Sequence, residues 1–399
     1  MRYAAAVALA LAGACASAGP RAPEALLPEG RELTPGVTYR QFTDAAGPWV
    51  MNLLTVDLRR SDLQLRQLRA RDQLKGREKM TDMVKRLTDG GTQVVAAVNA
   101  DFFWLTTGEN ENNQVIGGEW WKGVKVTDSP YDTYDNAHVQ FATDAAGRPS
   151  IDRYMLDATA WSRGVATPII TLNFNPSGNP EGTALYTSRY GAMTPRDTMR
   201  LTAEVAMSNA GRRGDTLLFV RRGAVSATSG SAIPTNGAVL AAYGSGSRAK
   251  EVQAMAEGDT VKVLLTTLPR LAGGAAAAMV IGGWPRILRD GEDVAALSAT
   301  LEGTISRNAE IRNPRTALGV SRDGSTLYLL TVDGRSQTSV GVTLVELAAI
   351  MRRLGAWQAM NFDGGGSTAM VIGGKVVNVT SDTGGEREVG NALAIVRRP

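Results

Sequence analysis

The spacing of apolar residues changes from helical to extended within the first hundred positions of the chain. In REKMTDMVKRLTDGG, apolar residues recur at intervals of three and four, at Met80, Met83, Val84 and Leu87, and Gly90 follows. This spacing predicts an amphipathic helix that ends at the glycine. The next run, QVVAAVNADFF, is short and almost continuously apolar, which predicts a strand buried on both faces.

The C-terminal hundred residues show a similar order of elements. STLYLLTVDG predicts a strand that ends at Asp333, and TLVELAAIMRRLGA predicts a helix that Thr343 and Glu346 begin with a capping box. WQAMNF predicts another strand, which DGGGST and the hairpin MVIGGKVVNV follow. Because a strand, helix and strand usually form a crossover with parallel strands, we expect Asp333 and Asp363 to lie at one rim of a sheet.

Two segments of the chain share the order helix, glycine, strand and Asn-x-Asp. The first contains Gly90 and ends in NAD at Asp101, and the second contains Gly355 and ends in NFD at Asp363. Internal duplication and chance similarity both remain open as explanations. The shared order predicts that Asp101 lies at the same rim as Asp363.

The middle of the chain, about 150 to 300, consists of short alternating runs separated by Gly, Pro and Asn, which predicts mostly antiparallel β structure. Upstream, PWVMNLLTVDLRRSDLQLRQL predicts two strands with a tight connection at 59–62. The expected fold class is therefore mixed α/β (α+β): a mixed β-sheet with packed helices and a β-rich middle region. We expect one domain at 36–399, with 150–300 as a subdomain or insertion within it.

The first residues, MRYAAAVALALAGACASAG, combine an arginine, an apolar run and small residues, as secretory signal peptides do. We expect a signal peptide at 1–18 and a Pro-, Glu- and Gly-rich linker at 19–35. Cleavage after an A-x-A motif and lipidation at Cys15 are both open. Either route predicts an extracytoplasmic protein that is periplasmic, secreted or lipid-anchored, with the membrane as a partner only through Cys15.

The composition of the chain excludes several chemistries. Lys and Arg number 43 against 39 Asp and Glu, and no basic block lies near aromatic clusters, so nucleic acid is not expected as a partner. Cys15 and His138 are the only residues of their types in the sequence, which argues against Ser-His-Asp, Cys-His and zinc chemistry. We expect His138 to be structural.

The stretch GENENNQ, 108–114, is the one candidate for a metal site. Its carboxylates and amides could hold a divalent cation such as calcium. Its ligand spacing is irregular, however, which favours a solvated loop. We therefore predict no cofactor and leave the metal open.

The loop DGGGST combines three glycines with two hydroxyl side chains. Glycines let a ligand approach the backbone, and exposed amides beside hydroxyls suit an oxyanion. The loop is not a nucleotide P-loop, because Gly366 rather than a lysine precedes Ser367. A serine nucleophile is poorly supported, since no histidine is placed to activate it. Taken alone, the loop is more often a structural turn.

Several further motifs occur before and after this loop. They are NADFF, IGGWP, RNPRTALG, TVDGR, the TLVELAAIMRRLGA helix, NFDGGGSTAM and GEREVGNALAI. Over about residues 48 to 396 this order resembles the phosphodiester glycosidase family. The resemblance implies hydrolysis of the bond between the anomeric carbon of a sugar and a phosphodiester oxygen, which releases free sugar and a phosphomonoester. It implies as substrate a sugar-1-phosphodiester in a glycan, a lipid or a wall polymer.

We accordingly expect arginines, amides and hydroxyls to bind phosphate, and carboxylates to activate water or attack the sugar. The candidate catalytic residues are Asp363, Asp101, Glu386 and Arg315. The candidate substrate- and phosphate-binding residues are Asn99, Arg315, Asp333, Arg335, Gly364, Gly365, Gly366, Ser367, Thr368, Arg387 and Asn391. Two alternatives remain: a non-catalytic carbohydrate-binding or exopolysaccharide-assembly protein, and a glycosidase that cleaves ordinary glycosidic bonds.

Overall fold

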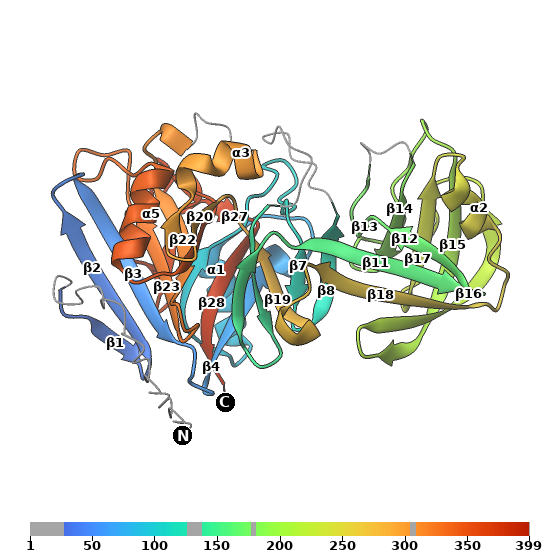
Figure 1. Cartoon of the computed structure of the whole chain (residues 1–399), viewed down its shortest axis with the longest axis horizontal. Coiled ribbons are helices and arrows are strands. Elements are labelled where there is room, and N and C mark those ends of the chain that lie inside the picture. The colour runs from blue at the N-terminus through green and yellow to red at the C-terminus, as the bar shows by residue number, and fades with distance from the viewer. Residues whose placement is uncertain (1–27, 126–137, 177–180, 304–308, 399) are drawn as a thin grey trace, which may run out of the picture.

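The computed structural model describes residues 28–125, 138–176, 181–303 and 309–398. The predicted signal peptide and Cys15 lie outside these ranges. Within them, the strands form three large sheets and one two-stranded ladder (Figure 1). The predicted linker ends too late, because residues 31–34 form the strand β1, which pairs with β2.

The first sheet carries both C-terminal motifs. Its strands, in order across the sheet, are β1 (Arg31–Thr34), β2 (Val37–Asp44), β3 (Trp49–Asp57), β23 (Thr326–Val332), β22 (Arg315–Val320), β24 (Gln358–Asn361), β20 (Arg286–Arg289) and β21 (Glu292–Asp293).

Helix α5 (Leu344–Arg353) connects β23 to β24 and buries its apolar face against this sheet. The predicted capping box is confirmed, since Thr343 and Glu346 bond each other's backbone amides. Strands β23 and β24 both pair antiparallel with β22, so they run parallel to each other with β22 between them. Their carboxyl ends therefore lie at one edge of the sheet, as the crossover predicted.

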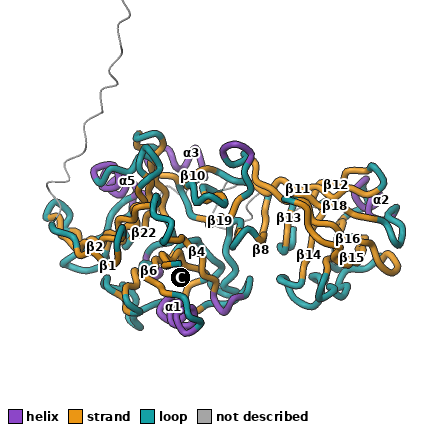
Figure 2. Tube along the Cα trace, turned by 90° about the horizontal axis from the view of Figure 1, so that it is seen from below, coloured by secondary structure: helices purple, strands orange, loops and turns teal. Residues whose placement is uncertain are grey.

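The second sheet packs against the first. Its strands, in order, are β26 (Lys375–Val376), β25 (Met370–Ile372), β6 (Gln93–Asn99), β28 (Asn391–Arg397) and β4 (Leu63–Arg69). Apolar residues of both sheets, such as Leu329 of β23 and Leu393 of β28, share one buried cluster. Figure 2 shows the end of the chain beside β4 and β6, between which β28 lies.

Helix α1 (Met80–Asp89) confirms the helical prediction, and it covers the second sheet with Met80, Met83 and Val84. The short strands β5 (Glu78–Lys79) and β27 (Glu388–Val389) pair beside its first turn. The two strands predicted around 59–62 also form, as β3 and β4. They belong to different sheets, however, so the connection between them is a crossing from one sheet to the other rather than a hairpin.

The third sheet contains the predicted β-rich middle region. Its strands, in order, are β10 (Pro149–Asp152), β9 (Gln140–Asp144), β19 (Ala277–Gly282), β7 (Gln114–Ile116), β8 (Glu119–Val124), β13 (Thr171–Leu172), β14 (Thr183–Thr187), β17 (Gly237–Tyr243), β15 (Thr202–Arg213), β16 (Thr216–Ser226), β18 (Thr260–Leu268), β11 (Met155–Ser162) and β12 (Val165–Ile169). Its pairings are antiparallel except that between β13 and β14.

The long strands β11 and β18 extend this sheet away from the other two, so that a separate β-rich lobe forms (Figure 1). Helices α2 (Ser247–Gln253), in this lobe, and α3 (Ser298–Glu302), near β20, are short. The fold is therefore mixed, but strands dominate and helices are minor. No helix in the described part of the chain is both long and apolar enough to cross a membrane.

Candidate active site

Asn99 joins the ends of strands from two sheets. Its side-chain amide donates to the backbone oxygen of Asp363 at 2.7 Å, and its side-chain oxygen accepts from the Thr316 hydroxyl at 2.7 Å. The backbone amide of Asp363 donates to the carbonyl oxygen of Ala100 at 2.8 Å. These bonds bring the ends of β6 and β24 together, so that Asp101 and Asp363 follow neighbouring strand ends.

Asp101 is buried, and amides orient it. Its carboxylate accepts from the side chain of Asn112 at 2.7 Å and from the Asn112 backbone at 3.2 Å. Its own backbone amide donates to the side chain of Asn391 at 2.9 Å. Burial raises the pKa of Asp101 to about 6, although the bonds from Asn112 and the nearby charge of Lys122 favour the ionised form.

Asp363 lies in a more positively charged environment than Asp101. Its carboxylate accepts from the Gly364 amide at 2.8 Å and from the Ser367 hydroxyl. Desolvation raises its pKa to about 6, against the opposing effects of these bonds and of the charges on Arg387 and Arg315. Asp363 is therefore mostly ionised at neutral pH and becomes protonated in mild acid.

Three predicted arginines surround the glycine loop. Arg315 is buried at the start of β22, and burial lowers its pKa to about 10, while the Asp363 carboxylate acts in the opposite direction. Arg335 lies against Gly365, where an added Cβ would stand 2.9 Å from its guanidinium. Arg387 donates to the Ser367 hydroxyl at 3.4 Å. The structure therefore brings these arginines to the side of the site that Asp363 occupies.

Arg387 is held by a carboxylate that the sequence did not single out. Its guanidinium makes two parallel bonds to Asp382, at 2.7 and 3.0 Å. Because this paired contact fixes the plane of the guanidinium, the remaining N–H donors of Arg387 point in fixed directions. No spacing signal marks Asp382, because the two residues lie five positions apart in an irregular loop rather than on one face of a helix or strand.

The glycine loop itself differs from the predicted anion cradle. Residues 365–367 form a single turn of 3-10 helix. The amides of Gly365, Ser367 and Thr368 donate to the backbone oxygens of Pro314, Gly364 and Gly365. These amides are consequently not available to a ligand in this structure. The glycines instead permit close packing. Gly365 has a φ of 61°, and a side chain at Gly365 would meet Arg335 while one at Gly366 would meet Arg387.

Two predicted carboxylates serve other contacts. Glu386 accepts from the backbone amide and the hydroxyl of Thr81, at 2.9 and 2.6 Å, and so caps the first turn of α1. Asp333 is buried and accepts from the Val379 amide at 3.1 Å. Burial raises the pKa of Asp333 to about 6. Asp333 lies at the expected edge but is directed toward the loop at Val379, whereas Glu386 is directed toward α1.

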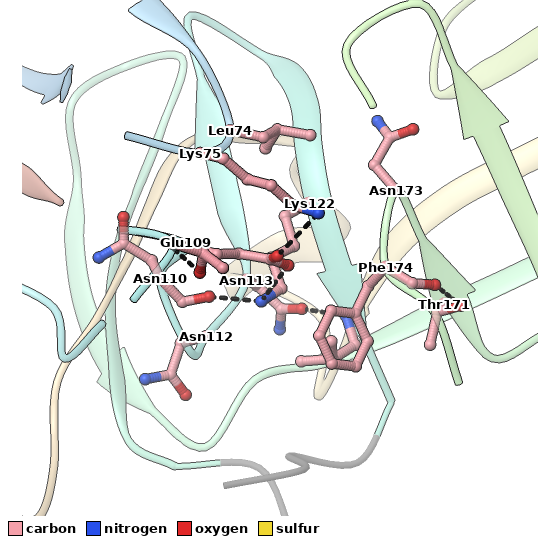
Figure 3. Close-up of polar contacts among 12 residues, drawn as sticks. Leu74, Lys75, Glu109, Asn110, Asn112, Asn113, Lys122, Thr171, Asn173 and Phe174 are labelled. Atoms are coloured by element: carbon pink, nitrogen blue, oxygen red, sulfur yellow. Dashed lines mark hydrogen bonds and ion pairs between the residues drawn. The ribbon is translucent and has the colours of Figure 1, made fainter. Parts of the chain in front are cut away.

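The stretch at 108–114 is buried, and the prediction of a solvated loop is wrong. Asn110 and Asn113 are fully buried, and Arg69 and Lys122, which are also buried, bond the side-chain oxygen and the backbone oxygen of Asn110. Figure 3 shows Asn110, Asn113 and Lys122 gathered beside Phe174 of the β-rich lobe. Charged residues from β4 and β8 thus make burial of this polar stretch favourable.

The structure gives no support for a metal site at this stretch. Among the described residues, no group of three or more His, Cys, Asp or Glu side chains is arranged to hold a metal ion. His138 is buried and stacks on Trp284, with ring centroids 4.8 Å apart, which fits the structural role predicted for it.

Comparisons with known proteins agree with the resemblance carried by the motifs in the second half of the chain. Residues 209–396 match the sequence model of the phosphodiester glycosidase family. The SPbeta prophage-derived uncharacterized protein YomE of Bacillus subtilis is 38% identical over 96 residues, which are 24% of this chain and 15% of that protein. The N-acetylglucosamine-1-phosphodiester alpha-N-acetylglucosaminidase of Mus musculus is 35% identical over 80 residues, 20% of this chain and 15% of the enzyme. The matches therefore span only about 15% of the length of these relatives, and they confirm the predicted resemblance.

Two solved structures share the fold. A Synechocystis protein described as hypothetical superposes with a TM-score of 0.72 at 22% identity, over 94% of this chain and 65% of that one. A candidate exported protein of Burkholderia pseudomallei has a TM-score of 0.65 at 26% identity, over 88% of this chain and 74% of that one. The likeness thus covers both the packed sheets and the β-rich lobe.

Proposed function

From the match to phosphodiester glycosidases, we propose that this chain hydrolyses a sugar-1-phosphodiester at the bond between the anomeric carbon and the phosphate oxygen. The products are a free sugar and a phosphomonoester. The observation that carries the proposal is the convergence of Asp101 and Asp363 from two sheets beside three arginines. The sugar and the group beyond the phosphate are left open.

The two sides of the site suit the two halves of such a substrate. Arg315, Arg335 and Arg387 supply cationic donors for the phosphate, and their charge stabilises the negative charge that grows on it as the bond breaks. A phosphomonoester, whose second pKa is about 6, leaves without needing a proton. The scarcity of histidine in the chain is therefore compatible with this reaction.

The carboxylates supply the remaining chemistry. Asp101 and Asp363 both have pKa values raised to about 6, so both are mostly ionised at neutral pH. One ionised carboxylate can attack the anomeric carbon or activate a water molecule, and the other can stabilise the positive charge that develops on the sugar ring. Glu386 has no part in this scheme, because its carboxylate caps α1.

The motifs at the N-terminus favour an extracytoplasmic setting for this activity. The sequence of the first 18 residues has the pattern of a secretory signal peptide. A substrate in a glycan, a lipid headgroup or a wall polymer would be accessible there. A soluble or a lipid-anchored form would both place the site outside the cytoplasm.

The proposal is tested by incubating purified protein with a panel of sugar-1-phosphodiesters, UDP-sugars included, and by measuring free sugar and phosphomonoester. We expect both products, with turnover abolished in Asp363→Asn and Arg315→Ala and retained in Asp89→Asn, an exposed carboxylate on α1. Circular dichroism should show all three variants folded. A folded wild-type protein that releases no sugar from any member would contradict the proposal. Release of sugar from alkyl or aryl glycosides that carry no phosphate, but from none of the phosphodiesters, would instead indicate an ordinary glycosidase.

A further inference from the structure

A small pocket lies where the β-rich lobe meets the loop that follows Asp101. Its volume is about 240 Å³. Trp104 and Glu109 line it from that loop, Lys75 lines it from the segment after β4, and Phe174 and Tyr190 line it from the β-rich lobe. Two separate parts of the fold thus build one concave surface.

The pocket and Asp101 belong to the same stretch of chain. The backbone amide of Trp104 donates to the backbone carbonyl oxygen of Glu109 at 2.9 Å, and the backbone amide of Gly108 donates to the carbonyl oxygen of Trp104 at 2.7 Å. This closed turn continues to Asn112, which bonds the Asp101 carboxylate. The pocket is therefore built on the same loop that orients the carboxylate of Asp101, although Asp101 itself is buried and does not line it.

The charges of the pocket, Lys75 and Glu109, are held in place by each other and by Lys122, which is buried and does not line the pocket (Figure 3). The Glu109 carboxylate stands 3.1 Å from the Lys122 ammonium and 3.8 Å from that of Lys75. These ammonium groups also lie over aromatic rings, at 4.3 Å from the Phe174 centroid and 5.1 Å from that of Tyr190. Two ammonium groups beside one carboxylate disfavour a cationic ligand, and because both are already paired with Glu109 their attraction for an anion is weakened.

The remaining groups select an uncharged ring that carries hydroxyls. A carboxylate has about four lone-pair sites, so Glu109 can accept further bonds, and an ammonium has three donors, so Lys75 can donate them. A hydrocarbon ligand would leave both groups desolvated without compensation, at a cost. A pyranose has C–H faces that pack on an aromatic ring and hydroxyls on its edge that donate and accept. The volume is below the about 300 Å³ at which larger small-molecule sites begin, so it suits one ring.

We infer that this pocket binds the pyranose ring of the substrate, with a ring face against Trp104 and ring hydroxyls on Glu109 and Lys75. The inference rests on the proposed function, and it assigns the sugar to the lobe-facing side of the site. The phosphate then extends toward the arginines beside Asp363. The β-rich lobe contributes Phe174 and Tyr190 and so takes part in choosing the sugar.

The test uses ligands that the proposed reaction cannot cleave. Methyl glycosides of several hexopyranoses, N-acetylated ones included, are titrated into the full chain, and binding is followed by saturation-transfer NMR. We expect at least one to bind and Trp104→Ala to weaken its binding about tenfold, the loss expected for one aromatic contact. The matched control is Trp357→Ala, which removes another half-buried tryptophan from a site outside the pocket.

Several outcomes would overturn the inference. They are binding that is equally strong in Trp104→Ala and wild type, no binding of any methyl glycoside, and binding of uridine alone that depends on Trp104. The two proposals also fail separately. If sugar-1-phosphodiesters are cleaved and Trp104→Ala leaves KM unchanged, the pocket assignment is wrong and the reaction stands. If methyl glycosides bind through Trp104 but no phosphodiester is cleaved, the reaction is wrong and the pocket assignment stands.

Discussion

A single methyl group at Gly366 would probe the arginine side of the site. A Cβ at this position would overlap the Arg387 guanidinium and the Asp382 carboxylate. Gly366 is not among the residues with positive φ, so alanine introduces no backbone strain there. Gly366→Ala should therefore displace the ion pair and leave the backbone of the loop in place.

The expected effect on stability is small. The side chains of Arg387 and Asp382 are 32% and 30% exposed, and partly exposed ion pairs contribute at most about 1 kcal/mol. Replacement of an unstrained glycine by alanine stabilises a protein by about 0.4–1 kcal/mol, because the unfolded chain loses freedom. These effects oppose each other, so the free energy of unfolding should change by less than about 1 kcal/mol.

The expected effect on turnover is larger. If Arg387 donates to the departing phosphate, its displacement removes a charge-assisted hydrogen bond, which is worth about 1.5–3 kcal/mol. This loss corresponds to a fall in kcat/KM of about 10- to 150-fold. The substrate would be the sugar-1-phosphodiester that the wild-type protein cleaves best, with release of phosphomonoester measured at neutral pH.

Gly384→Ala is the matched control. Gly384 lies in the same irregular loop, has no positive φ, and has no atom within 4 Å of an added Cβ. We expect this variant to keep wild-type kcat/KM and wild-type stability in urea. Wild-type kcat/KM in Gly366→Ala would show that Arg387 does not contact the leaving group. A loss of turnover accompanied by more than about 2 kcal/mol of destabilisation would show that the pair is structural.

Two further predictions concern carboxylates. Glu386→Gln should lower the free energy of unfolding by about 1 kcal/mol, because it weakens the bonds that cap the start of α1 at Thr81. It should leave kcat unchanged. The control in the urea unfolding and activity assays is Glu388→Gln, which changes an exposed carboxylate nearby. Asp333 has a pKa raised from 3.8 to about 6 in the folded state, so its contribution to stability is full below pH 3.8 and is lost as the pH rises through 6. Asp333→Asn removes this dependence, and urea unfolding should show the variant gaining up to about 3 kcal/mol relative to wild type between pH 4 and 7.5; a difference that does not change with pH would contradict the assigned pKa.

Elements with a local signal were predictable from the sequence. The period of Met80, Met83 and Val84 defined α1, and the spacing of Thr343 and Glu346 defined the start of α5. Each of these signals is contained within one or two turns of helix. The edge shared by Asp333 and Asp363 also followed, because chain order restricts how a strand, helix and strand can connect.

Features that depend on distant residues were not predictable. The polar stretch around Asn110 is buried because Arg69, 41 positions earlier, supplies its bonds. Glu386 acts as a cap because the start of α1, 305 positions earlier, lies opposite its carboxylate. Likewise, nothing near 59–62 indicates that the strands on either side join different sheets. In each case the sequence shows the residue type, and the tertiary packing decides its role.

The repeated Asn-x-Asp pattern has a physical explanation in the structure. Asn99 and Asn361 are both buried at strand ends, and each donates its side-chain amide at 2.7 Å to a backbone oxygen of a neighbouring segment, that of Asp363 and of Trp284. Each asparagine thus fixes the end of its strand just before an aspartate emerges. Asn99 in the second sheet bonds the backbone oxygen of Asp363, which follows a strand of the first sheet. The packing of the two sheets therefore also determines how the chain at Asp101 and the chain at Asp363 lie relative to each other. The same local need at both strand ends accounts for the pattern whether or not the segments arose by duplication.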